Sequence, residues 1–224
     1  MEDIRILEIA RSYLGSNSIM DEVTEKKINV LLNDIKSTVI PRYVYNIYDI
    51  SINSDVISFK DTVLKIKSKD LSDLLKSSPK CIIIACTLGN YVENKLRHFS
   101  KYSVSDGLIY DALAAAYIEE FLNDLNNELE KDYEHLTMRY SPGYGDLKLE
   151  VQPILLNLLH AQKRIGLTAT EEYLLIPRKS ITAFIGIQNT PWVDAKILCD
   201  TCKLKDVCEL RKEGKFCGAR KNIK

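Results

Sequence analysis

The chain of 224 residues lacks net charge, because 31 Lys and Arg residues balance 31 Asp and Glu residues. A general nucleic-acid binder needs an excess of cations to displace the counterions of the phosphates. The sequence also lacks an apolar run long enough to cross a bilayer, and it begins with the acidic Met1-Glu2-Asp3 where a signal peptide would be basic. We therefore expect a cytoplasmic protein that binds neither nucleic acid nor membrane.

Glycine-rich nucleotide-binding motifs are absent as well. The sequence contains neither a Gly-x-Gly-x-x-Gly pattern nor a Walker motif, and the single Gly89 after an apolar run is too weak a signal to replace them. The absence of a glycine-rich turn after the first strand also disfavours an ordinary methyltransferase that acts on another substrate.

A chain of 224 residues is long enough to bury a core that needs no disulfide bonds, and its 46% of hydrophobic residues is ordinary for a globular protein. Cys81–Cys86 is a continuous apolar run and predicts a strand buried on both faces. A long helix is expected to begin at Ser105 as its N-cap, with apolar positions spaced by threes and fours from Leu108 to Leu129.

The remaining pattern mixes helices and strands without a regular βαβ alternation. Helices are expected in the first forty residues, over 69–76, over 91–99 and from Pro153 to a C-cap at Gly166, and extended segments over 43–52, 56–66, 173–176 and 180–187. This order favours an α+β fold, with a mixed, mainly antiparallel twisted sheet packed against helices.

One loop carries residues suited to binding a small molecule, the segment Arg139–Tyr144. The planar guanidinium of Arg139 suits a carboxylate, and Gly143 lets the backbone approach a ligand closely. Ser141 and Pro142 can hold an extended backbone, and Tyr144 adds an aromatic face and a hydroxyl. Taken alone, the loop also fits an ordinary turn with a surface arginine, because Pro-Gly turns are common.

The segments around this loop favour the ligand-binding interpretation. The loop resembles the Arg-x-x-x-Gly-Tyr loop of the activation domain of cobalamin-dependent methionine synthase. Similar stretches follow at Ile165-Gly166-Leu167-Thr168, Leu174-Leu175-Ile176-Pro177 and Ser180-Ile181, and Ala85-Cys86-Thr87-Leu88-Gly89 and Asp111-Ala112-Leu113-Ala114 resemble short stand-alone members of that family. The resemblance spans residues 80–190 and rests on the ordered set of motifs.

The resemblance implies an α+β domain that binds S-adenosylmethionine and holds it over the cobalt of cobalamin. The cobalamin would be carried by a methionine synthase or another corrinoid protein, with a flavodoxin or ferredoxin as the electron donor. By position, Arg139 would bind the methionyl carboxylate, and Tyr144 would lie near the reacting end. Ser141, Pro142 and Gly143 would line the nucleoside with backbone groups.

Two departures from the family leave an alternative open. The acidic contact that the family places on the long helix falls on Ala115, so an ammonium contact would come from elsewhere, such as Glu119 one turn later. Trp192 and Asp194 lie where a second group of contacts is expected, but the chain no longer aligns there. The alternative is a metal-bearing adaptor that has kept the fold and lost the ligand.

Four cysteines crowd the C-terminus. Cys199 and Cys202 are separated by two residues, Cys208 follows after five more and Cys217 after another eight. Four thiolates can hold a tetrahedral zinc ion or an iron–sulfur cluster, although a second Cys-x-x-Cys pair is missing and reduced cysteines on a polar tail remain the plain alternative. We therefore divide the chain into an α+β domain over residues 1–195 and a cysteine-rich basic tail over 196–224.

Overall fold

The structure is a computed structural model that describes residues 3–15, 21–190 and 206–207. The helices are α1 (Asp3–Tyr13), α2 (Glu22–Thr38), α3 (Lys69–Leu75), α4 (Asn90–Tyr102), α5 (Val104–Asp132), the 3-10 turn η1 (Leu149–Val151), α6 (Gln152–Leu158) and α7 (Ala161–Ile165). The strands are β1 (Arg42–Asn53), β2 (Val56–Phe59), β3 (Lys65–Lys67), β4 (Lys80–Thr87), β5 (His135–Leu136), β6 (Thr168–Ala169), β7 (Leu175–Ile176) and β8 (Ser180–Gln188). None of the helices in these described ranges is long and apolar enough to span a membrane.

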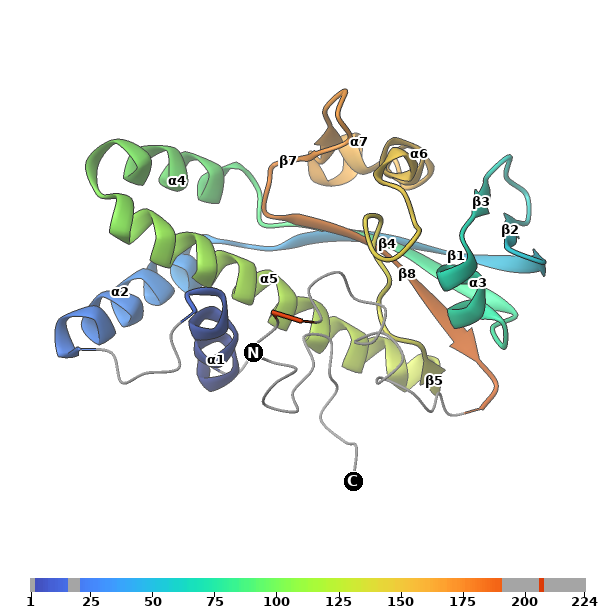
Figure 1. Cartoon of the computed structure of the whole chain (residues 1–224), viewed down its shortest axis with the longest axis horizontal. Coiled ribbons are helices and arrows are strands. Elements are labelled where there is room, and N and C mark those ends of the chain that lie inside the picture. The colour runs from blue at the N-terminus through green and yellow to red at the C-terminus, as the bar shows by residue number, and fades with distance from the viewer. Residues whose placement is uncertain (1–2, 16–20, 191–205, 208–224) are drawn as a thin grey trace.

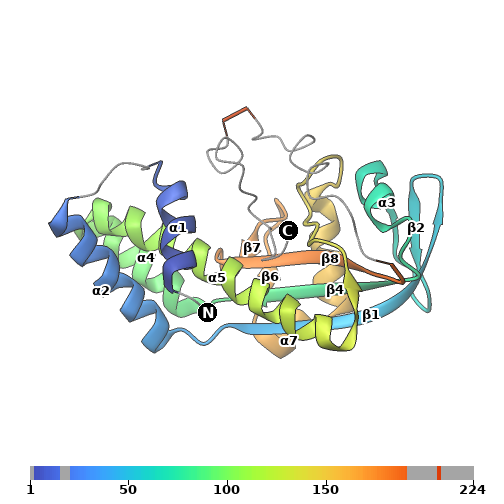
Figure 2. The ribbon, with the colours of Figure 1, turned by 90° about the horizontal axis from the view of Figure 1, so that it is seen from below.

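A six-stranded sheet in the order β3-β2-β1-β4-β8-β5 forms the centre of the molecule, and every neighbouring pair is antiparallel. Helix α5 runs along one face of the sheet and α1, α2 and α4 pack against α5, while α3, α6 and α7 lie on the other face (Figures 1 and 2). A separate two-stranded ribbon pairs β6 with β7. The predicted α+β class, with its antiparallel sheet and packed helices, is therefore confirmed.

The continuous apolar run over 81–86 forms strand β4, which lies between two hydrophobic cores. Ile82, Ile84 and Cys86 belong to the core under the long helix α5, and the alternate residues Cys81, Ile83 and Ala85 belong to the core under α6 and α7. All six side chains are at most 1% exposed. Because both faces of the strand are covered, neither face has a place for a polar residue.

Helix α5 carries small side chains in its first half and packs against α1, α2 and α4 as well as against the sheet. Ala112, Ala114 and Ala116 are all buried, and larger apolar residues follow along the same helix toward its C-terminus. The expected N-cap at Ser105 is wrong by two residues. Ser103 has the extended backbone of a cap, and its side chain accepts from the amide of Asp106, while Ser105 already lies within the first helical turn.

The single helix expected between Pro153 and Gly166 is divided into α6 and α7. His160 adopts the left-handed backbone conformation, with φ of 50°, and this breaks the helix between the two parts. Gly166 is the C-cap of α7, as predicted, again with a positive φ.

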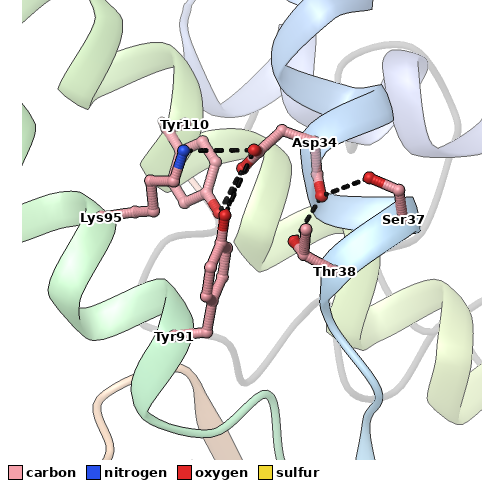
Figure 3. Close-up of polar contacts among 6 residues, drawn as sticks. All are labelled: Asp34, Ser37, Thr38, Tyr91, Lys95 and Tyr110. Carbon is pink, nitrogen blue, oxygen red and sulfur yellow. Dashed lines mark hydrogen bonds and ion pairs between the residues drawn. The ribbon is translucent and has the colours of Figure 1, made fainter.

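A polar cluster joins three helices of the α1–α2–α4–α5 layer. The carboxylate of Asp34 on α2 accepts from the hydroxyl of Tyr91 at 3.2 Å and from Nζ of Lys95 at 3.1 Å, both on α4 (Figure 3). It also accepts from the hydroxyl of Tyr110 on α5 at 3.3 Å. The cluster therefore holds α2, α4 and α5 together at one carboxylate.

Candidate functional site

The segment Arg139–Tyr144 starts beside strand β8, where Tyr140 continues the edge that β5 begins. The backbone of Tyr140 exchanges two hydrogen bonds with Phe184, each of 2.9 Å. The Tyr140 side chain is 1% exposed and packs into the core under α6 and α7. The start of the loop is therefore fixed to the central sheet.

Local hydrogen bonds shape the rest of the loop. The amide of Gly143 donates to the carbonyl of Leu147 at 2.7 Å, and the amide of Leu147 donates to the carbonyl of Tyr144 at 2.9 Å. Gly143 has φ of 95° and Gly145 has φ of 48°. Side chains other than glycine rarely adopt such values, so this turn requires glycine at both positions.

Asp146 fastens the end of the loop to the N-terminus of α3. Its carboxylate accepts from the side chain of Ser68, the N-cap of α3, and from the amide of Lys69 at 2.7 Å. The amide of Asp146 donates in return to the carboxylate of Asp70 at 3.1 Å. The loop is thus held at both ends, by β8 and by α3.

Arg139 points the other way, onto the long helix α5. Its Nη2 donates to Oε2 of Glu119 at 2.8 Å and to Oδ1 of Asn123 at 3.0 Å. The Arg139 side chain is 9% exposed and that of Glu119 is 24% exposed. The guanidinium is therefore largely removed from water and held in one orientation by a charge and an amide.

The polar chain continues beneath Arg139 as far as α1. Nδ2 of Asn123 donates to Oε2 of Glu120 at 3.1 Å, and Arg5 of α1 lies 3.4 Å from Oε1 of the same carboxylate. The Glu120 side chain is 1% exposed, and Arg5 offsets its charge. This second pair fixes which way the amide of Asn123 faces and so which atom Arg139 meets.

Cys86 lies on β4 close to the Arg139–Glu119 pair. Burial raises the pKa of its thiol to about 12, while the charge of Arg139 acts to lower the pKa and that of Glu119 to raise it. The thiol is therefore neutral, and Cys86 is an apolar core residue, as the sequence predicted, like Cys81.

The residues predicted to bind the ligand differ in their exposure to solvent. Pro142 is buried, Ser141 and Gly143 are half-buried, and Tyr144 is 46% exposed, with its ring edge-on to that of Tyr140 at 5.8 Å between centroids. The exposed part of the loop is therefore its C-terminal half, around Tyr144.

Sequence reasoning named Glu119 but missed Asn123 and Asp146. Glu119 and Asn123 are four residues apart on α5, so they lie on one face of the helix and can meet one arginine. That spacing could have predicted Asn123 as a second partner of Arg139. No sequence pattern predicts the contact of Asp146 with α3, because an acidic residue after a Pro-Gly turn is common.

Two of the other motifs behind the family resemblance, those at 85–89 and 180–181, meet where β4 ends and β8 begins. The hydroxyl of Ser180 donates to that of Thr87 at 2.7 Å, and the amide of Leu88 donates to the carbonyl of Lys179 at 2.9 Å. Nζ of Lys179 also pairs with Asp111 of α5 at 2.9 Å. This junction and the Tyr140–Phe184 bridge lie four residues apart on β8, about 13 Å along the strand.

The predicted metal ligands Cys199, Cys202, Cys208 and Cys217 lie outside the described residues, as do Trp192 and Asp194. Among the residues that the structure describes, no group of three or more His, Cys, Asp or Glu side chains is placed to hold a metal ion. The cysteine site and the division of the chain at residue 195 stay predictions.

Comparison with known proteins identifies the fold. No family model and no curated protein matches the chain. Among solved structures, it is similar to a crystal structure of the MetH reactivation domain bound to AdoHcy, with a TM-score of 0.57 and 17% sequence identity over 97% of this chain and 78% of that one. At this identity the likeness establishes a shared fold, in which helices pack on an antiparallel sheet as they do in the reactivation domain.

Proposed function

We propose that the chain binds S-adenosylmethionine at the segment Arg139–Tyr144 and supports the reductive methylation of cobalamin carried by a partner protein. The observation that carries the proposal is the likeness of nearly the whole chain to a reactivation domain that holds AdoHcy, the product left when S-adenosylmethionine loses its methyl group. The loop that the sequence singled out is rigidly built in this fold, which supports the same assignment.

Each part of the loop offers one kind of contact. Arg139 binds the methionyl carboxylate, since both of its hydrogen bonds within the described residues come from Nη2 and Nε and Nη1 still have donors to give. Ser141, Pro142 and Gly143 supply backbone groups to the nucleoside. Tyr144, the most exposed of the set, lies near the reacting end.

The protein contributes position and leaves the chemistry to the two cofactors. S-adenosylmethionine supplies the methyl group, an external donor supplies one electron, and cob(II)alamin receives both to give methylcobalamin and S-adenosylhomocysteine. We propose a cobalamin-dependent methionine synthase or another corrinoid protein as the partner, and a flavodoxin or ferredoxin as the donor. The four terminal cysteines would hold zinc or an iron–sulfur cluster.

Titration calorimetry of the purified protein with S-adenosylmethionine and with S-adenosylhomocysteine tests the proposal. Binding should raise the unfolding temperature as ligand is added, because a ligand held at 100 times its Kd stabilises the native state by about 2.7 kcal/mol. Saturating ligand without heat of binding or thermal stabilisation would instead favour an adaptor that has the fold alone. Ala115, where the family has an acidic contact, is the observation in favour of that adaptor.

A further inference from the structure

Strand β1 is paired on both sides over only part of its length. Its residues 42–49 pair with β4, whereas β2 pairs with residues 50–53. Where the pairing with β2 ends, the amide of Lys60 donates to the carbonyl of Asp49 at 2.9 Å. As far as the described residues extend, the side of β1 that faces away from β4 is therefore open before Asp49, and Figure 2 shows β1 along the outside of the sheet there.

The backbone groups on this open side follow from the geometry of the strand. The amide of Ile50 donates toward β4, to the carbonyl of Pro79 at 3.0 Å, and the pairing with β4 keeps one continuous register. Since the hydrogen-bonding groups of neighbouring residues in a strand point to opposite sides, those of Tyr43, Tyr45 and Ile47 point away from β4. No other described residue hydrogen-bonds to them there. We call these groups the β1 edge.

The side chains of this segment leave the β1 edge open to another strand. Natural proteins usually protect an edge with charged residues, proline or a bulge. Residues 43–48 contain neither a charge nor a proline, and they consist of three tyrosines, two β-branched residues and one asparagine, types that mostly favour strands. Tyr43 is still 42% exposed although its ring contacts those of Tyr45 and Phe121. The edge therefore combines unpaired backbone with uncovered aromatic surface.

We propose that two copies of the chain form a dimer by antiparallel pairing of their β1 edges, which joins the two sheets into one. The register that uses every group of the edge places Tyr45 on the two-fold axis and Tyr43 of one protomer opposite Ile47 of its partner. Residues that face each other in this way exchange two backbone hydrogen bonds per pair. The dimer is independent of the proposed function, because it requires no ligand.

The two ends of the segment favour a second copy over an unrelated strand. In this register Pro41 of one protomer lies opposite Asp49 of the other. Pro41 has no N–H to pair, and the carbonyl of Asp49 already accepts from Lys60, so groups that cannot pair face each other. Antiparallel order also brings Arg42 to the end of the partner strand that carries Asp49, whereas a parallel copy would place like charges together.

The first test is the mass of the full chain, measured by analytical ultracentrifugation at about 100 µM and at about 1 µM. Twice the mass of one chain is expected at the higher concentration. Hydrogen exchange over residues 42–49 then locates the contact. The amides of the β1 edge should exchange at least about tenfold more slowly in the dimer than in the dilute chain, because pairing removes them from water.

A proline on the edge tests the backbone contact itself. Tyr43→Pro removes an outward N–H from each protomer and keeps the bonds to β4, so it should raise the dissociation constant of the dimer at least about tenfold. Val63→Pro is the matched control, since Val63 is 100% exposed in the loop between β2 and β3 and should dimerise like the wild type. Circular dichroism shows whether both variants keep the fold.

A chain that stays monomeric at the higher concentration overturns the inference and leaves the β1 edge to an extended segment of another protein. A dimer whose exchange over 42–49 does not slow, or one that folded Tyr43→Pro does not weaken, overturns it as well, because the contact then lies elsewhere. If Tyr43→Pro does not fold, the exchange of the wild-type chain decides alone. None of these outcomes bears on the binding of S-adenosylmethionine.

Discussion

At the scale of single residues, Arg139 has one observed role and one proposed role. It joins the loop to α5 through Glu119 and Asn123, and we propose that its remaining donors bind a ligand. A substitution that removes the guanidinium should therefore affect binding, and it also leaves Glu119 without its cation. The affinity for the ligand and the free energy of unfolding therefore have to be measured on the same variant.

We expect Arg139→Ala to weaken S-adenosylmethionine binding by about 1.5–3 kcal/mol, the range for a lost hydrogen bond to a charged group. Titration calorimetry measures the loss, and urea unfolding on the same samples shows how much of the fold is retained. Arg139→Lys keeps the charge but loses the planar fork, so it should bind with intermediate affinity. An unchanged affinity in Arg139→Ala would remove this residue from the site.

Asp146 is a residue whose contribution should depend on pH. Burial raises the pKa of its carboxyl, but the hydrogen bonds from Ser68 and from the amides of Lys69 and Asp70 outweigh that effect and lower the pKa below its usual value. Its stabilising contribution is therefore complete above the unfolded pKa of about 3.9 and is lost as the pH falls through the lower, folded value.

Replacing Asp146 by Ala should lower the free energy of unfolding at pH 7 by about 1 kcal/mol, as expected for a lost helix cap. The gap between variant and wild type should begin to narrow below about pH 4 and should close once the pH lies below the lower, folded pKa of Asp146. Asp73→Ala, at an exposed position of α3, is the control and should follow the wild-type curve. A gap that persists at low pH would show that Asp146 acts through something other than its charge.

At the scale of elements, α4 combines little buried apolar surface with polar contacts to its neighbours. Val92 is its one fully buried residue, and its link to α2 passes through Asp34 (Figure 3). Tyr110 of α5 meets the same carboxylate although its side chain is 0% exposed, and burial raises the pKa of its hydroxyl. The hydrogen bond of Tyr110 is therefore the one whose loss would leave a buried polar group unsatisfied.

Asp34→Ala should lower the free energy of unfolding by about 2 kcal/mol, because the buried hydroxyl of Tyr110 loses its acceptor. Urea unfolding followed by circular dichroism gives the value. Lys26→Ala on the same helix removes an ion pair in which both side chains are at least 75% exposed, and it should change stability by less than about 0.5 kcal/mol. Equal effects of the two substitutions would mean that the Asp34 cluster does not hold the helices together.

The elements that could be predicted are those with a strong repeating pattern. The run over 81–86 could only be a strand covered on both faces, and α5 shows its apolar face at helical spacing. Strands β5 and β6 have two residues each, too few for any periodicity, and they were missed. The break at His160 was missed as well, because no glycine or proline marks its left-handed backbone.

At the scale of the whole molecule, strand order decides what the site contains. β4 and β8 are neighbours although more than ninety residues separate Thr87 from Ser180, which share a hydrogen bond. The same sheet places Tyr140 beside Phe184. The residue types of the loop and the family resemblance of the motifs around it pointed to Arg139 and the loop. The partners of the loop follow from this antiparallel pairing, which no local pattern encodes.

The division of the chain at residue 195 leads to the last prediction. All of the described helices and strands, with Arg139, Glu119 and the loop, precede that position. A chain that ends at residue 195 should therefore unfold at the same urea concentration as the full chain and bind S-adenosylhomocysteine within about threefold of it. It should carry no metal, whereas the full chain, purified without oxygen, should carry either one zinc ion or an iron–sulfur cluster.

Elemental analysis and the visible spectrum of the full chain distinguish the two metal centres. A colourless sample with one zinc ion per chain excludes the cluster. Cys202→Ser in the full chain is the matched variant, since it removes one thiolate and keeps the length. If the shortened chain loses its affinity for S-adenosylhomocysteine while Cys202→Ser keeps it, residues beyond 195 belong to the ligand site and the proposed boundary is wrong.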